Sequence, residues 1–112
     1  RSNGIKLLVE HAEKNATGFP LIISGDFNAS PTSDTYATAA KLLLDAKKVS
    51  MTPHEGPEQT FHKYGTVVRD YPIDYIFVSK DIKVLSHKTE DARFEEGFAS
   101  DHYPVVTKLL LD

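Results

Sequence analysis

The 112-residue sequence contains no cysteine, which excludes disulfide bonds and thiolate metal sites. No apolar run approaches the length that is needed to span a membrane. Positive charge is not in excess, because 13 lysine and arginine residues stand against 16 acidic residues, for a formal net charge of -3. The chain is therefore not expected to hold nucleic acid through bulk positive charge. An enzyme that meets phosphate through a metal ion is still compatible with this balance, because the ion supplies the local positive charge.

The sequence also begins without methionine and shows no signal peptide. We therefore expect it to be an excised piece of a longer protein, and its location, cytoplasmic or secreted, stays open. Its length suits one compact domain. With 40% hydrophobic and 26% charged residues, it has the composition of a globular protein rather than of a disordered one.

The alternation of helix and strand patterns predicts an α/β or α+β layer fold. Helices are expected over residues 3–17 and 33–47, and strands over 20–25, 71–78, 82–88 and 105–111, with irregular chain over 49–60 and 89–99. The apolar run from Leu21 to Ile23 suits a strand that is buried on both faces.

Periodicity also predicts which single side chains are buried. Leu8 and Ala40 fall on the expected buried faces of the two helices. Simple alternation along the third expected strand places His87 on its solvent face.

Residues 60–65 are harder to interpret from the sequence. They combine two aromatic side chains with a histidine and a lysine, so they either face a substrate or form a short exposed hairpin. We assign no functional role to His54 or His62, because isolated histidines are weak signals.

The stretch from Ile23 to Pro31 begins as a strand and ends as a polar turn. It contains Asp26 and Asn28, and residues two apart in an extended segment project to the same side. A carboxylate and a carboxamide therefore share one space at the end of a rigid element, where active sites of open α/β sheets lie. Such a pair suits a site that handles a metal ion, a water molecule and a phosphoryl oxygen. The alternative is an Asx turn, in which both side chains cap backbone groups.

Two further acids stand out later in the chain. Asp74 interrupts an otherwise apolar strand, and a buried carboxylate is costly unless a histidine or a backbone donor pairs with it. Asp101 precedes His102 in a turn before the last strand, and together they offer an oxygen ligand and an imidazole. The alternative for this turn is that Asp101 caps the backbone and His102 is exposed.

Three segments carry a family resemblance when they are read in order. They are Gly25-Asp26-Phe27-Asn28, Ile73-Asp74-Tyr75-Ile76-Phe77 and Ser100-Asp101-His102-Tyr103-Pro104-Val105. Together they resemble the C-terminal half of the endonuclease/exonuclease/phosphatase (DNase I-like) family. The resemblance implies that residues 1–112 are a single partial domain. It implies an α/β (α+β) fold, half of a four-layered α/β/β/α sandwich, with a mixed, mainly antiparallel sheet and helices on one face.

The same resemblance implies a hydrolase that cleaves phosphodiester or phosphomonoester bonds with Mg²⁺ or Mn²⁺. It implies that Asp26 activates the attacking water and that Asn28 contacts a phosphoryl oxygen. It further implies that His102 contacts the scissile phosphate while Asp74 holds its ring. The implied metal ligands are Asp26, Asn28 and Asp101. A neighbouring carboxylate raises the pKa of a histidine, which favours imidazolium near neutral pH.

The family's other half-site, which includes a glutamate that is a principal metal ligand, is not in this sequence. We therefore expect weak metal binding and little or no activity from the chain as given. Half of a face-to-face sandwich also leaves one apolar sheet face open, so we expect self-association as a two-fold dimer. The substrate stays open among nucleic acid, phospholipid and small molecules. A non-catalytic protein-binding scaffold that kept the fold is the alternative function.

Overall fold

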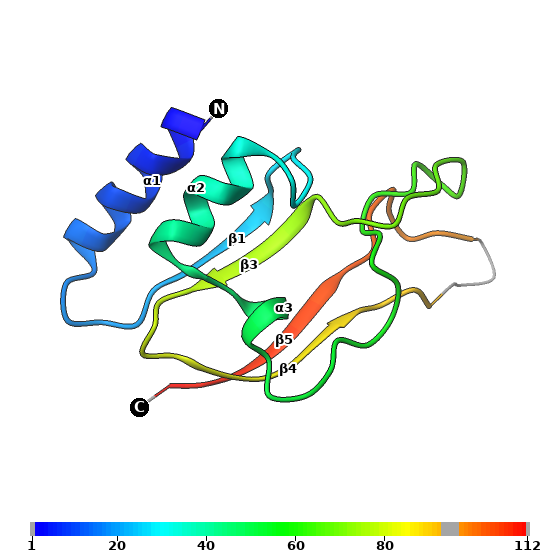
Figure 1. Ribbon diagram of the computed structural model, residues 1–112. Coiled ribbons are helices and arrows are strands. Elements are labelled where there is room, and N and C mark those ends of the chain that lie inside the picture. Colours follow the sequence, from blue (N-terminus) through cyan, green and yellow to red (C-terminus); the bar gives the residue numbers. More distant parts are fainter. Residues whose placement is uncertain (1, 93–96, 112) are drawn as a thin grey trace.

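The structure is a computed structural model that describes residues 2–92 and 97–111 (Figure 1). Its elements are α1 (Ser2–Asn15), β1 (Ile22–Asp26), α2 (Asp34–Leu42), β2 (Leu44–Asp45), α3 (Ala46–Val49), β3 (Asp74–Val78), β4 (Lys83–Thr89) and β5 (Val105–Leu110). Residues 93–96, in the segment expected to be irregular, lie outside the described residues. In the part of the chain that the structure describes, no helix is long and apolar enough to cross a membrane.

The described strands form two antiparallel sheets. In the first sheet β3 lies between β1 and β2, and in the second β4 pairs with β5. The helices α1 and α2 pack together over one face of the first sheet (Figure 1). This mainly antiparallel α/β architecture, with both long helices on one face, confirms the fold class expected from the sequence.

The main core lies between these helices and the first sheet. Tyr75 and Phe77 alternate along β3 and reach the helix side, where they meet Val9 of α1. Phe27, in the turn after β1, stacks on Phe77 with the ring centroids 5.4 Å apart. Burial of each large apolar side chain contributes about 1.5–3 kcal/mol. The aromatic cluster therefore holds β3, which begins at Asp74, firmly beneath the helices.

A second core joins the two sheets through the short helix α3. Its buried members are Ala46, Val78, Ile82 and Val84. They come from α3, from the end of β3, from the turn before β4 and from β4 itself. This cluster positions the second sheet beside the first.

The second helix is shorter than the expected span of 33–47. It begins after Ser33, whose hydroxyl caps it as the sequence suggested, and it ends at Leu42. The chain then leaves the helix because β2 pairs with β3. Asp45 of β2 also accepts a hydrogen bond from the backbone N–H of Lys47, at the start of α3. Strand pairing and this new cap outweigh the local helix propensity.

Two side chains expected on buried helix faces are exposed. Leu8 is 50% exposed, and Ala40 is also exposed. Helix α1 packs mainly against α2, and α2 buries only Thr35 and Ala39 completely. Each helix therefore has one narrow contact stripe rather than the wide apolar face that its periodicity predicts.

Strand β1 is not buried on both faces, which its apolar run had predicted. It is an edge strand that pairs only with β3, and Ile22 is 44% exposed. The helices cover the other face of β1, where Leu21 and Ile23 pack against the main core. The first sheet thus presents apolar surface to solvent at this edge.

His87 is buried, not solvent-facing as simple alternation predicted; its exposed fraction is only 4%. The register between β4 and β5 shifts between Val84 and Ser86, so Leu85 is an extra residue in the ladder. A bulge of this kind reverses the alternation of side chains beyond it. His87 consequently shares the inner face with Val84.

Candidate active site

The first part of the site is built by the register of β1 against β3. Asp26, the last residue of β1, is paired directly with Asp74, the first residue of β3. Directly opposed residues in an antiparallel pair have Cβ atoms about 4.5–5.5 Å apart, and like charges at such positions repel. Two carboxylates are therefore held close together at a sheet end. Their mutual repulsion makes this arrangement unfavourable unless a cationic group lies near both.

That cationic group is the imidazole of His102. Its Nδ1 lies 2.6 Å from Oδ2 of Asp74, and its Nε2 lies 3.8 Å from Oδ2 of Asp26. Partial burial works against the charged ring, but the hydrogen bond and charge of Asp74, with the charges of Asp26 and Asp101, raise the pKa of His102. The arrangement therefore favours imidazolium between the two carboxylates.

The turn that carries His102 is held by residues 60–63. The backbone N–H of Tyr103 donates to the carbonyl of Thr60 at 2.7 Å, and Phe61 forms an antiparallel bridge with His102. The rings of Phe61 and His102 lie 5.0 Å apart. Of the two interpretations left open for residues 60–65, the exposed hairpin is wrong for residues 60–62, which pair with the histidine turn, whereas residues 63–65 do form an exposed turn.

Thr60 connects the two halves of the acid–histidine pair. Its buried hydroxyl accepts hydrogen bonds from the backbone N–H groups of Ile73 and Asp74, at 3.0 and 3.2 Å. Its carbonyl meanwhile holds Tyr103, the residue after His102. Sequence analysis singled out no role for Thr60. Its partners are distant in the sequence, so no local pattern could have identified them.

Asn28 follows the end of β1, two residues after Asp26, in a turn rather than in the extended segment that the spacing argument assumed. Its backbone is left-handed, with φ of 53°, and its N–H donates to Oδ1 of Asp26 at 2.7 Å. Asp26 thus forms an Asx turn with one oxygen while its other oxygen faces His102. The turn interpretation and the active-site interpretation of this stretch are therefore compatible.

Asp101 lies next to the site rather than within the closest group. The potential ligand atoms of Asp26, Asp74 and His102 all lie within 4.8 Å of one another, and Asp101 is not part of that set. The backbone carbonyl of Asp101 accepts the N–H of His62 at 2.9 Å. Its charge contributes to the raised pKa of His102, so its carboxylate acts on the site electrostatically.

The donor set suits a hard divalent cation held mainly by oxygen. Asp74 is engaged by the imidazole, and a protonated His102 offers no lone pair to a metal ion. Asp26 is the most exposed member of the close group and is therefore the carboxylate best placed for an ion such as Mg²⁺, which normally keeps several water ligands. These residues fit one side of a magnesium site.

Figure 1 shows that β3 and β5 both begin at the loop-rich end of the molecule, where β1 ends. The two acids, the imidazole and the turn of Asn28 all belong to this end. Fold and site together define the class of the protein, a layered α/β domain with an acid–histidine centre at a sheet end.

The sequence matches the endonuclease/exonuclease/phosphatase family over residues 4–102, and the chain belongs to this family of phosphoesterases. A solved member from Bacteroides vulgatus shares 28% identity, with a TM-score of 0.89, and the match covers 99% of this chain and 44% of that one. A mannosyl-6-phosphatase from Bacteroides thetaiotaomicron has the same fold, with 24% identity and a TM-score of 0.84, over 97% of this chain and 45% of that one.

A conserved protein of unknown function from Enterococcus faecalis is similar to the same extent, with 24% identity, a TM-score of 0.82, and coverage of 99% of this chain and 44% of that one. No curated protein sequence matches the chain significantly. The chain thus spans less than half the length of the solved structures that it resembles, as a partial domain should.

Proposed function

We propose that this chain supplies one half of the active site of a metal-dependent phosphoesterase. The observation that carries the proposal is the imidazole of His102, hydrogen-bonded to Asp74 through Nδ1 while its Nε2 faces Asp26. One nitrogen is thereby anchored, and the other is directed toward the place where a water and a phosphoryl group would meet. A scaffold without catalytic function would gain nothing from three polar groups converging at an open sheet end.

Each residue has a role that follows from its position. Asp26 orients the attacking water and accepts its proton, because its outer oxygen is exposed at the strand end. His102 donates a hydrogen bond from Nε2 to a phosphoryl oxygen, and Asp74 keeps the ring oriented and charged. Asn28 contributes a further donor to the phosphoryl group. The ester P–O bond breaks, and the leaving oxygen takes a proton from solvent.

The proposed cofactor is Mg²⁺ or Mn²⁺, held by Asp26 with help from Asn28 and Asp101. When bound, the ion would offset negative charge on the phosphoryl oxygens. The chain supplies only a few oxygen ligands, which fits weak binding of the ion with water molecules in the remaining coordination positions.

The proposed substrate is a small phosphomonoester. Two observations support this choice over a nucleic acid. The chain has a net charge of -3, so it supplies no excess of positive charge for the phosphates of a nucleic-acid backbone. A mannosyl-6-phosphatase shares the fold at a TM-score of 0.84.

The chain alone is proposed to be inactive or nearly so, because it spans about 44% of the related structure from B. vulgatus. The test is Mg²⁺- or Mn²⁺-dependent hydrolysis of an aryl phosphomonoester by the 112-residue chain and by its His102→Ala variant. We expect turnover close to background in both. Turnover that disappears in the variant would contradict the proposed inactivity but support the site.

We also propose that the exposed edge of the first sheet, at β1, packs against a second copy of the chain. Ile22 and Ser24 project from β1 on the face opposite the helices, and Ile22 is well exposed. Sedimentation at micromolar concentration should show a dimer that Ile22→Lys weakens. Leu7→Lys is the control, since Leu7 is exposed on α1. A monodisperse monomer would contradict this proposal.

A further inference from the structure

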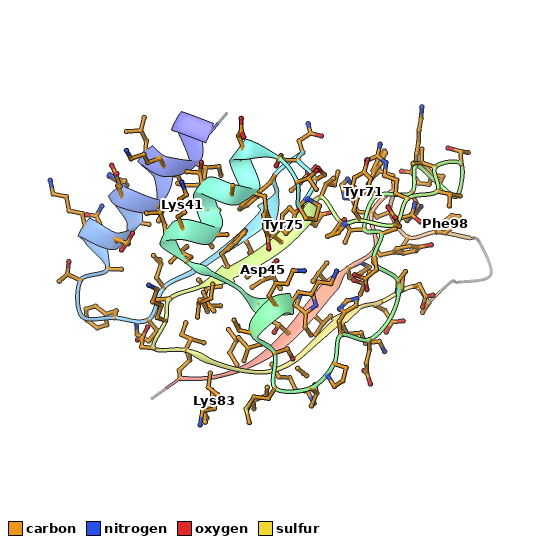
Figure 2. All side chains as sticks on the ribbon, viewed as in Figure 1. Lys41, Asp45, Tyr71, Tyr75, Lys83 and Phe98 are labelled. Atoms are coloured by element: carbon orange, nitrogen blue, oxygen red, sulfur yellow. The ribbon has the colours of Figure 1, made fainter. Side chains whose placement is uncertain are left out.

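An open hollow of about 390 Å³ lies at the same end of the molecule as the site. It is lined by Ser30, Pro31, Thr32, Asp70 and Tyr71. These residues come from the turn after β1 and from the chain that leads into β3, the two segments that continue directly into Asp26 and Asp74. Figure 2 shows Tyr71 at this loop-rich end, on the same side as Phe98.

The two segments are joined next to the site. The backbone N–H of Phe27 donates to the carbonyl of Ile73 at 2.9 Å, immediately beyond the paired acids. The hollow is therefore attached to the strand ends that hold the carboxylates, and it continues the site outward.

The lining chemistry is that of a hydroxyl-binding surface. Tyr71 offers an aromatic ring, and Asp70 offers an exposed carboxylate that can only accept hydrogen bonds when ionised. The hydroxyls of Ser30 and Thr32 lie 3.0 Å apart and present a polar edge that both donates and accepts. A ring and several hydrogen-bonding groups around one hollow suit a ligand with apolar C–H faces and many hydroxyls.

Arg69 links the hollow to the imidazole. Its guanidinium lies over the ring of Phe61 at 5.3 Å and over the ring of Tyr71 at 5.5 Å. Phe61 in turn contacts His102, with ring centroids 5.0 Å apart. Among the described residues Arg69 takes part in no salt bridge. A positioned cation without a carboxylate partner is suited to an anionic oxygen of a ligand.

We infer that the hollow binds the hydroxylated leaving group of a sugar or polyol phosphate, and that Arg69 contacts an oxygen of its phosphate. The inference rests on the proposed phosphoesterase function and adds the part of the substrate beyond the phosphoryl group. The carboxylate of Asp70 argues against a nucleic acid, because a second phosphate placed in the hollow would meet a like charge.

Binding to the 112-residue chain can be followed without any activity, by amide NMR in the presence of Mg²⁺. Four probes are compared: glucose 6-phosphate, inorganic phosphate, free glucose and a single-stranded tetranucleotide. We expect glucose 6-phosphate to bind most tightly and to shift signals both at His102 and in the hollow, including Thr32 and Tyr71. Inorganic phosphate should shift the signals around His102 alone.

Variants separate the hollow from the phosphoryl site. Asp70→Ala should weaken the binding of glucose 6-phosphate about tenfold or more, the usual effect of losing one hydrogen bond to a charged group. It should not weaken the binding of inorganic phosphate. Asp81→Ala is the matched control, because Asp81 is an exposed aspartate in the turn between β3 and β4. Tyr71→Ala should weaken glucose 6-phosphate, whereas Tyr71→Phe, which retains the ring, should preserve most of the affinity.

The outcomes distinguish this inference from the proposed function. Suppose that phosphate probes shift the signals at His102. Equal affinities for glucose 6-phosphate and inorganic phosphate would then overturn the hollow as a leaving-group site, and so would an unchanged affinity for glucose 6-phosphate in Asp70→Ala. Preference for the tetranucleotide would overturn it as well. The absence of any shift at His102 with every phosphate probe would instead overturn the proposed phosphoesterase site.

Discussion

The Nδ1 atom of His102 lies 2.6 Å from Oδ2 of Asp74, although the two residues are 28 positions apart in the chain. The contact answers two questions that the sequence left open, namely what pairs with Asp74 and what orients His102. It gives the acid within an apolar strand its partner, and it orients an otherwise ordinary turn histidine. Removal of one partner should therefore change the other in a way that NMR can measure.

We expect Asp74→Asn to lower the pKa of His102 toward that of an exposed histidine. The carboxylate of Asp74 supplies the main hydrogen bond and charge that raise this pKa. NMR titration of the ring with EDTA present would measure the shift without interference from metal. Asp81→Asn serves as the control at a distant exposed acid. An unchanged pKa in Asp74→Asn would show that the contact does not stabilise the imidazolium.

The same raised pKa predicts how His102 affects stability. A histidine whose pKa is higher in the folded state stabilises the fold while it is protonated in both states, below about pH 6.5. This contribution is lost as the pH rises through the folded pKa. Urea unfolding at several pH values should therefore show that Asp74→Asn costs less stability in alkaline than in mildly acidic solution.

Thr60→Val should destabilise the chain by about 1–3 kcal/mol, because two backbone N–H groups lose their acceptor. Those donors belong to Ile73 and Asp74, and the hydroxyl that accepts them is buried. Thr60→Ser keeps the hydroxyl and should retain most of the stability. Urea denaturation of both variants tests the prediction. Equal losses in the two would mean that the methyl group, rather than the hydroxyl, is responsible.

His87 should make the protein less stable in mild acid. Burial first, then the nearby charges of His54 and Lys47, lower the pKa of His87 to about 4, although Glu58 acts in the opposite sense. Between about pH 6.5 and about pH 4, His87 is protonated in the unfolded chain but neutral in the folded chain. The free energy of unfolding therefore falls by about 2–3 kcal/mol as the pH is lowered from about 6.5 to about 4. His87→Gln should reduce this slope in urea titrations.

The matched control for this effect is His11→Gln, because His11 is exposed on α1. Its substitution should leave the acid slope unchanged. The neutral state of His87 also suits its surroundings, since its Nδ1 lies 2.9 Å from Nδ1 of His54 and two protonated rings would both be donors there. An acid slope that persists in His87→Gln would assign the effect to another group.

Gly56→Ala should be strongly destabilising, whereas Gly18→Ala should cost only about 1–2 kcal/mol for its left-handed backbone. Both glycines have positive φ, 86° and 84°. A Cβ at Gly56 would clash with the carbonyl oxygen of Thr89, and a Cβ at Gly18 would meet nothing within 4 Å. Thermal unfolding of the two variants isolates the steric effect. Similar melting temperatures would show that the loop at Gly56 can move away from β4.

Local sequence patterns were sufficient for the order of the two longer helices and the four longer strands, but they did not predict β2 and α3. The apolar runs and the capping residue Ser33 act over a few positions, so their effects can be read directly from the chain. The same applies to the polar turn that follows the first strand, where the N–H of Asn28 donates to Asp26 two residues earlier. The resemblance of three ordered segments also identified the family, which the match over residues 4–102 confirms.

Other features depended on segments that meet only after folding. The bulge at Leu85 that turns His87 inward comes from the pairing of β4 with β5. The end of α2 comes from the pairing of β2 with β3. Neither partner strand is close in sequence, so periodicity predicted the wrong burial for His87 and too long a helix.

The sequence by itself determined the family and the fold class, and it singled out the polar residues of the candidate site. Only the tertiary structure decided their arrangement: Asp26 opposite Asp74, the imidazole of His102 between them, and Thr60 tying the histidine turn to β3. The physical reason is that composition and spacing act locally, whereas hydrogen bonds and like-charge contacts between distant segments exist only once strand register brings those segments together.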